Sequence, residues 1–284
     1  GHIDHLLVSA GSGASTFGEA FSKGVPNDFI KNTLIADFNN LNQVKKIIYD
    51  NKDEIAAIIM EPIPANMGLV LPNDNFIQEI RKICDENRIV LIFDEVITGF
   101  RASLGGAEQY LKVKPDMSCI GKIIGGGFPI GAFGGKKEIM ENISPLGGVY
   151  HAGTLSGNPV AVSAGLATLN LLLHENKFIY KDIELKALKL KENILSEVKN
   201  VSINQLGSML TIFFTDSSPK NFGDVKKCNF KDFGNFFRHI LNQGIMFPPS
   251  QFETIFVSSA HTEKDINKTS EVCIEALKTL EIPN

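Results

Sequence analysis

Residues 89–95 read Ile-Val-Leu-Ile-Phe-Asp-Glu, an apolar run that ends in two carboxylates. A short, continuous apolar run bounded by polar residues is typical of a strand that is buried on both faces. Such strands form parallel sheets covered by helices, and ligands bind these sheets at the carboxyl ends of the strands. The run therefore predicts a buried parallel strand that presents Asp94 at a ligand-binding edge.

Helical and strand-like patterns alternate on both sides of this run. Apolar residues at helical spacing predict helices at 41–51 and at 74–83, and apolar runs predict strands at 55–60 and 117–121. We expect residues 6–28, which are rich in small and flexible residues, to form a mobile loop. The alternation predicts an α/β fold with a mostly parallel sheet.

The pattern changes after residues 158–159. Two helical stretches are expected at 160–174 and 185–198, the first leading into a second domain, followed by a strand at 209–214, a helix at 233–242, a strand at 254–259 and a helix at 263–280. These elements predict a small α+β domain. We therefore expect a large domain over residues 1–172 and a small C-terminal domain over residues 173–284.

Composition excludes several classes of function. Of the 284 residues, 43% are hydrophobic and 21% charged, and a net charge of −4 disfavours nucleic acid and anionic membranes as partners. No apolar stretch approaches the roughly 20 residues that a membrane-spanning helix needs. The four cysteines are scattered without a C-x-x-C pair, which predicts neither disulfides nor a metal site and favours a reducing compartment. A small-molecule substrate is expected.

Asp94 and Lys122 are the candidate chemical groups. Lys122 follows the predicted strand at 117–121, beside Gly121 and the glycines at 125–127. A lysine, a carboxylate and small residues in one crevice suit pyridoxal phosphate, because the lysine forms the Schiff base and the carboxylate pairs with the pyridinium nitrogen. From local pattern alone, a lone Asp is more often a cap or turn residue and a lone Lys is usually solvated, so these alternatives stay open.

Longer motifs carry a family resemblance. The stretches IFDEVITGFR at 92–101 and GKIIGGG at 121–127 resemble the class III pyridoxal-phosphate-dependent aminotransferases. AGSG at 10–13, EP at 61–62, NMG at 66–68, AGTLSGNP at 152–159 and PSQFE at 249–253 also match in family order, and the first and last of these are similar to the glutamate-1-semialdehyde aminomutase branch. The resemblance implies a fold type I transferase, with a large cofactor domain and a small α+β C-terminal domain.

The resemblance also implies roles for individual residues. Lys122 would form the Schiff base and move protons, Asp94 would pair with the pyridinium nitrogen, and Val96 would pack on the ring. The remaining roles would be a hydrogen bond near the ring hydroxyl from Asn66, phosphate contacts from Gly153 and Thr154 of the neighbouring subunit, a gating loop containing Ser12, and a place near the substrate for Glu253. Shared active sites in a homodimer follow from these phosphate contacts.

The implied reaction moves an amino group within one molecule. The pyridoxamine form of the cofactor aminates the aldehyde of (S)-glutamate 1-semialdehyde, and the other amine of the resulting diamine returns to the cofactor, which releases the tetrapyrrole precursor 5-aminolevulinate. A closed gating loop would retain the diamine. A class III aminotransferase with an external amino donor and a noncatalytic fragment of such an enzyme are the alternatives. The expected location is the cytoplasm, or the plastid stroma for a plant or algal protein.

Two departures from the family pattern accompany this resemblance. His151 stands where family members commonly have Gln, so a phosphate-side or subunit contact is expected to differ, the alternative being a histidine that is merely satisfied at the interface. The opening residues Gly-His-Ile-Asp match an internal family stretch, which favours an N-terminal truncation over a vector scar. The expected preceding section would carry further phosphate contacts, an aromatic residue stacked on the ring and an arginine for the substrate carboxylate.

Overall fold

The computed structural model describes residues 7–8 and 23–280, which form two compact units. Asn51–Ile63 and Asp74–Lys181 make up one, which we call the parallel-sheet unit. The described residues of Gly1–Asp50, Pro64–Asn73 and Asp182–Asn284 make up the other, the antiparallel-sheet unit. The expected division between residues 1–172 and 173–284 stays a prediction.

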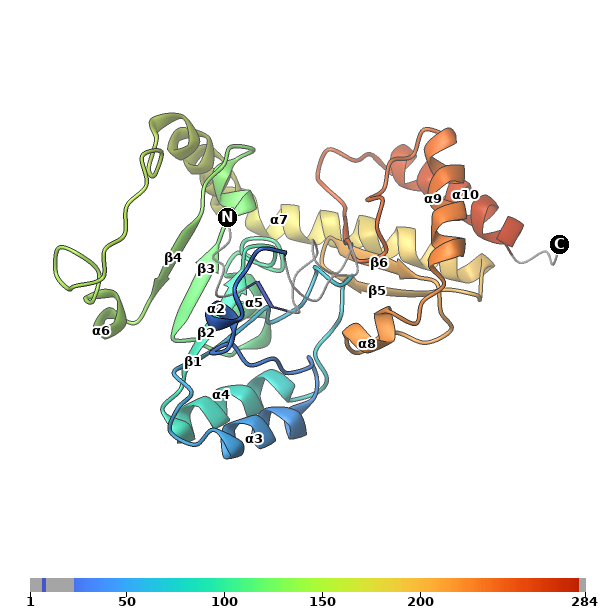
Figure 1. Cartoon of the computed structure of the whole chain (residues 1–284). Coiled ribbons are helices and arrows are strands. Elements are labelled where there is room, and N and C mark those ends of the chain that lie inside the picture. The colour runs from blue at the N-terminus through green and yellow to red at the C-terminus, as the bar shows by residue number, and fades with distance from the viewer. Residues whose placement is uncertain (1–6, 9–22, 281–284) are drawn as a thin grey trace. The chain divides into compact units, whose positions relative to one another are not determined.

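The parallel-sheet unit is built on four strands in the order β1-β2-β3-β4 (Figure 1). β2 pairs in parallel with β1 and β3, which confirms the predicted mostly parallel sheet, and β4 runs antiparallel to β3. β4 was not anticipated, because its sequence Ala-Phe-Gly-Gly has little strand propensity. The elements are β1 (Ala57–Met60), α4 (Phe76–Asn87), β2 (Val90–Glu95), α5 (Gly106–Leu111), β3 (Met117–Ile120), the 3₁₀ helix η2 (Lys122–Gly125), β4 (Ala132–Gly135) and α6 (Lys137–Met140).

The core of this unit follows from periodicity. Along β2 the side chains of Leu91, Phe93 and Glu95 are buried, whereas those between them are half-buried, as expected when successive residues point to opposite faces. α4 buries Ile77 and Ile80, which lie on one helical face. The apolar spacing thus places β2 in the centre of the sheet.

α7 corrects one expectation about the second half of the chain. Residues 160–174 and 185–198 were expected as separate helices, but they form a single α-helix, α7 (Pro159–Glu197), of 39 residues. The intervening residues 175–184 contain neither proline nor glycine, so nothing interrupts the helix. Its start is well specified, since the Asn158 Oδ1 accepts a hydrogen bond from the Ala161 N–H at 3.0 Å and Pro159 is the first helical residue.

The antiparallel-sheet unit has a sheet in the order β5-β6-β7, with antiparallel pairing throughout. Figure 1 labels β5 and β6 of this sheet. The C-terminal part of α7, α9 and α10 contribute Ile194, Phe236 and Leu277 to its core. β5 was not expected, because its sequence Ser-Ile-Asn-Gln-Leu is largely polar although the strand is almost wholly buried. The elements are α2 (Asn27–Ile30), α3 (Leu41–Asp50), β5 (Ser202–Leu206), β6 (Met209–Phe213), α8 (Phe222–Val225), α9 (Phe230–Asn242), β7 (Ile255–Phe256) and α10 (Glu263–Leu280).

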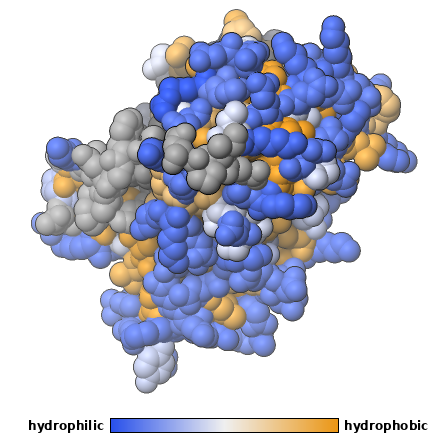
Figure 2. Space-filling model, turned by 90° about the vertical axis from the view of Figure 1, so that its right-hand side faces the viewer, coloured by the Kyte–Doolittle hydropathy of each residue, from blue (hydrophilic) through white to orange (hydrophobic). Residues whose placement is uncertain are grey.

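The surface agrees with the composition. Hydrophilic residues dominate the face seen in Figure 2, and hydrophobic residues appear there in separate patches. Among the described residues no helix is both long and apolar enough to span a membrane. The expected loop at 6–28 falls mainly outside the described residues, although α2 begins within its last two positions.

Asp116 ties β2, β3 and α4 together. Its side chain is 7% exposed and accepts hydrogen bonds from Arg81 Nη1 at 2.9 Å, Lys136 Nζ at 2.6 Å and the Leu91 N–H at 2.7 Å. Burial alone would raise the pKa of Asp116, but the bonds from Lys136, Leu91 and Arg81 outweigh it and lower the pKa to about 2. The native state therefore favours the ionised carboxylate.

We predict that Asp116→Asn lowers the free energy of unfolding by about 2 kcal/mol at pH 7, because it weakens two cation contacts to a buried group. A depressed native pKa stabilises the fold above the unfolded value near 3.8, and this contribution is lost as pH falls from there towards 2. Urea unfolding should show that the difference in the free energy of unfolding between the wild type and Asp116→Asn becomes smaller as the pH falls from 7 to 3. Asp85→Asn, at the exposed partner of Arg81, is the matched control and should change stability by less than about 0.5 kcal/mol.

Gly165 allows α7 to pack closely on η2 within the parallel-sheet unit. A Cβ at Gly165 would lie 2.1 Å from the Ile124 carbonyl oxygen, and one at Gly126, which has φ +56°, would lie 2.5 Å from the Ala164 oxygen. Glycine inside a helix costs roughly 1 kcal/mol relative to alanine. Close packing of two backbones explains why it stands here.

We predict that Gly165→Ala lowers the melting temperature by several degrees, although alanine is the better helix former, because α7 must move away from η2. Gly234→Ala in α9 is the control, since its Cβ would meet its nearest atom at 3.7 Å. That variant should be neutral or more stable by up to about 1 kcal/mol. Equal thermal stability of the two variants would contradict the packing argument.

Candidate active site

Asp94 and Lys122 lie at the same edge of the parallel sheet. β2 and β3 are parallel neighbours in which Asp94 pairs with Cys119 and Glu95 with Ile120. Lys122 begins η2 two residues after β3 ends. Since the carboxyl ends of parallel neighbours lie at one edge, the structure brings together the two residues that the sequence singled out.

Asp94 is half-buried at the end of β2. Its Oδ1 accepts a hydrogen bond from the Val96 N–H at 3.0 Å, which orients the carboxylate and starts the turn after the strand. Cys119 faces it from β3, and burial together with the negative charge of Asp94 raises the pKa of that thiol. Cys119 is therefore a neutral neighbour of the carboxylate at neutral pH.

Lys122 is exposed and has an unusual backbone. Its φ is +47°, in the left-handed region that residues other than glycine rarely adopt, so packing around η2 must hold the backbone there. Gly121 precedes it, and a Cβ at Gly121 would lie 3.3 Å from Val96 Cγ1. Val96, Gly121 and Lys122 are thus adjacent, which places a branched apolar side chain beside the lysine-bearing turn.

Glu95 is a residue near the site that the sequence did not single out as a candidate. Its side chain points to the buried face of β2, and its carboxylate accepts hydrogen bonds from Thr98 Oγ1 at 2.8 Å, the Ala107 N–H at 2.7 Å and the Glu108 N–H at 2.9 Å. The only signal in the sequence is the Asp-Glu doublet itself, because strand alternation must turn one of the two carboxylates inward.

Asn66 and Glu253 come together within the antiparallel-sheet unit. The Gly68 N–H donates to the Phe252 carbonyl at 2.6 Å, and Thr254 Oγ1 donates to the Ala65 carbonyl at 3.0 Å. These bonds flank Asn66 on one segment and Glu253 on the other. Both side chains are half-buried.

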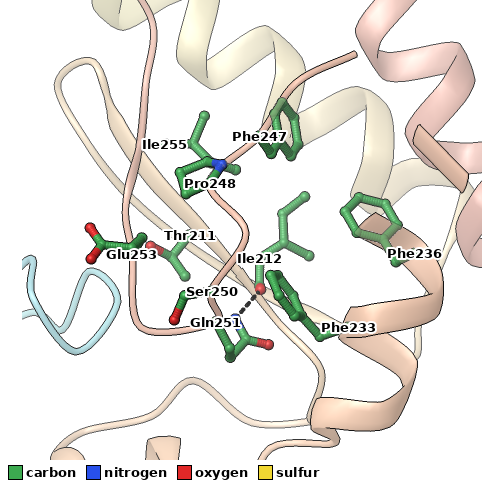
Figure 3. Close-up of a pocket in the computed structure, with 10 residues that line it drawn as sticks. All are labelled: Thr211, Ile212, Phe233, Phe236, Phe247, Pro248, Ser250, Gln251, Glu253 and Ile255. Carbon is green, nitrogen blue, oxygen red and sulfur yellow. Dashed lines mark hydrogen bonds between the residues drawn. The ribbon is translucent and has the colours of Figure 1, made fainter. Parts of the chain in front are cut away.

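Glu253 lines a small pocket of this unit (Figure 3). Its carboxylate points away from the aromatic rings of Phe233, Phe236 and Phe247 on the other side. Gln251 is buried and donates from Nε2 to the Ile212 carbonyl at 2.8 Å, which fixes the Ser-Gln-Phe-Glu segment. Glu253 is thereby held at the polar side of the pocket.

Gly153 and Thr154 are exposed in the loop before α7. The Gly153 carbonyl accepts from the Ser156 N–H at 3.0 Å, and among the described residues neither Gly153 nor Thr154 bonds to Asp94, Val96 or Lys122. His151 packs edge-on against Phe133 of β4, with ring centroids 5.2 Å apart. Ser12 lies outside the described residues, so its role stays a prediction.

Comparison with known protein sequences places this geometry in a family. The profile of the family described as aminotransferase class-III matches residues 8–277. The chain is 49% identical to a glutamate-1-semialdehyde 2,1-aminomutase of Acetivibrio thermocellus over 95% of the chain and 63% of that relative. It is 50% identical to one of Clostridium kluyveri over 94% of the chain and 64% of that relative. The chain thus spans less than two thirds of the length of these relatives.

Solved structures share the fold. An omega-transaminase from Sphaerobacter thermophilus superposes with a TM-score of 0.86 at 27% identity, covering 98% of this chain and 66% of that one. A glutamate-1-semialdehyde aminomutase from Pseudomonas aeruginosa, solved with pyridoxamine phosphate (PMP), has a TM-score of 0.81 at 20% identity, covering 99% and 64%, which shows the fold alone. The matching profile, together with the carboxylate and lysine at one sheet edge, shows that the chain belongs to the class-III aminotransferase family.

Proposed function

We propose that this chain acts in a pyridoxal-phosphate-dependent aminomutase that converts (S)-glutamate 1-semialdehyde to 5-aminolevulinate for tetrapyrrole synthesis. The observation that carries the proposal is the placement of Asp94 and Lys122 at the carboxyl ends of adjacent parallel strands. The identity of 49–50% to proteins named as this aminomutase supports the choice of reaction.

The residues at the sheet edge fit pyridoxal phosphate. A half-buried carboxylate suits a pyridinium nitrogen, and an exposed lysine amine suits the aldehyde carbon. Val96 is half-buried beside Gly121 at this edge, where its apolar side chain would pack against a planar ring. The bound cofactor supplies an electron-withdrawing ring for the ionisation of a substrate C–H bond.

The chain's own residues hold protons and orient groups in this proposal. Lys122 Nζ holds the cofactor and carries protons to and from substrate carbon, while Asp94, oriented by the Val96 N–H, keeps a proton on the ring nitrogen. Asn66 bonds near the ring hydroxyl and Glu253 lies near the substrate. Ser12, which lies outside the described residues, is assigned a part in excluding water and retaining the diamine.

A homodimer would complete the site through Gly153 and Thr154, which contact the phosphate of the neighbouring subunit in this proposal. The parallel-sheet unit supports it with exposed apolar side chains around that loop, a composition typical of interaction surfaces. Those near the start of α7 and before it include Leu146, Val149, Tyr150, Leu155, Val160 and Leu166.

The cytoplasm is the compartment that we propose for this activity. Among the described residues Cys84, Cys119, Cys228 and Cys273 are free thiols, which suits a reducing environment. The bacterial sources of the similar aminomutases agree with this location.

The reaction is tested without an amino donor. We expect the purified protein, loaded with pyridoxamine phosphate, to convert glutamate 1-semialdehyde to 5-aminolevulinate stoichiometrically, because the amino group is returned in each cycle. Product is measured colorimetrically with and without an added amino acid. Turnover only with the added donor would instead support an aminotransferase, the class to which the structurally similar omega-transaminase belongs. Cofactor binding without either reaction would support a noncatalytic fragment.

Variants at the sheet edge test the assigned roles. Lys122→Ala should abolish turnover, because no other amine is assigned to hold the cofactor and relay the proton. Asp94→Asn should lower the turnover number by more than about tenfold, equivalent to roughly 1.4 kcal/mol, since the neutral amide stabilises a protonated ring nitrogen less well. Rates come from the aminolevulinate assay at saturating cofactor. Near-normal turnover of Lys122→Ala would refute the assignment.

A further inference from the structure

We propose that Glu95 is a positioning residue that holds Asp94 and Val96 in place by anchoring the end of β2 to the start of α5. The inference rests on the proposed function, because it assigns Asp94 to the ring nitrogen of pyridoxal phosphate. The Glu95 side chain points to the opposite face of the strand from Asp94, so in this proposal it acts through the backbone and not on the cofactor itself.

The carboxylate of Glu95 is unusual because it is buried without a cationic partner among the described residues. The residue is 3% exposed, and its three described hydrogen-bond donors are neutral: the Thr98 hydroxyl and the N–H groups of Ala107 and Glu108. No lysine, arginine or histidine forms an ion pair with it among the residues that the structure describes. Burying a carboxylate without a cation is costly unless its oxygens are well bonded. The three hydrogen bonds to its oxygens therefore indicate that Glu95 has a specific structural task.

That task is to fix the turn that follows Asp94. The Glu95 carbonyl accepts from the Gly99 N–H at 2.8 Å, and its side chain accepts from Thr98. Both the backbone and the side chain of Glu95 thus close the same turn. Val96 lies inside this turn, and its N–H orients the Asp94 carboxylate. A change at Glu95 is therefore transmitted to Asp94 through one shared segment of backbone.

Gly106 shows that the space is shaped around this carboxylate. Gly106 has φ +67°, and a Cβ there would lie 2.4 Å from Glu95 Oε2. The backbone at the start of α5 can approach the carboxylate only because the side chain is missing. The fit depends on both oxygens, since Oε2 accepts from Thr98 and Ala107 while Oε1 accepts from Glu108.

The test uses Glu95→Gln, which keeps the shape but turns an amide NH₂ towards N–H donors. Protein loaded with ¹⁵N-labelled pyridoxal phosphate is examined by NMR, and turnover is measured in parallel. We expect the ring-nitrogen resonance to move towards its unprotonated position and turnover to fall by about tenfold or more. Thr98→Val removes one of the three hydrogen bonds to the Glu95 carboxylate. It should shift the resonance and the turnover in the same direction as Glu95→Gln, but to a smaller extent. This second variant keeps the proposal testable if Glu95→Gln does not fold.

Glu108→Gln is the matched control. Glu108 lies on α5, and its backbone N–H donates to Glu95. Among the described residues the side-chain carboxylate of Glu108 forms no hydrogen bond or ion pair. Neither the resonance nor turnover should change. Asp94→Asn provides the second comparison, because Glu95→Gln should add little further effect in that background if it acts through Asp94.

The outcomes separate the two proposals. An unchanged resonance in both Glu95→Gln and Thr98→Val, or effects of Glu95→Gln on turnover that multiply with those of Asp94→Asn, would overturn the positioning role. A lower melting temperature with an unchanged resonance would do the same, because it marks a purely structural contact. Protein that binds cofactor and shows the shift without converting glutamate 1-semialdehyde would refute the reaction alone, whereas failure to bind cofactor would refute both.

Discussion

The parallel pairing of β2 with β3 is the constraint on which the candidate site depends. In this register Glu95 lies beside Ile120, so the two strands end within a residue of each other and the chain segments that leave them begin at one edge. A shift of one residue would turn Asp94 towards the opposite face. The apolar side chains of Leu91 and Phe93 prevent such a shift, because it would expose them.

Strand alternation places the two adjacent carboxylates in different surroundings. Asp94 lies on the half-buried face, with a backbone N–H that orients its carboxylate, while Glu95 lies in the core with three hydrogen-bond donors. In the proposed function Asp94 pairs with the cofactor ring, whereas Glu95 holds the backbone around it. Their environments differ although they are neighbours in the chain, because burial and hydrogen bonding depend on the face to which a side chain points.

α7 connects the lysine-bearing turn with the loop that contains Thr154. Its first residues follow that loop directly, capped by Asn158, and one to two turns later Gly165 packs on the backbone of η2. The first turns of α7 thus adjoin both segments within the parallel-sheet unit. Lys122, whose φ of +47° lies in the left-handed region, begins the same 3₁₀ helix on which Gly165 packs.

The sequence by itself determined the alternation of helices and strands, the buried character of β2 and the edge at which Asp94 and Lys122 lie. These follow from local periodicity and from the rule that parallel strands share their carboxyl edge. It also pointed to the family, because the Asp-Glu and Gly-Lys blocks are long enough to be specific. The exact bounds of β2 differ from the apolar run by only one or two residues.

Only the tertiary structure decided what the remaining residues do. It joined the two expected helices into α7, added β4 and β5, and gave Glu95 its partners on α5, which lie 12 and 13 positions away in the chain. It also placed Asn66 beside Glu253, residues that are far apart in sequence. The physical reason is that packing and hydrogen bonding between distant segments leave no period in the sequence, whereas burial of one face of a helix or strand does.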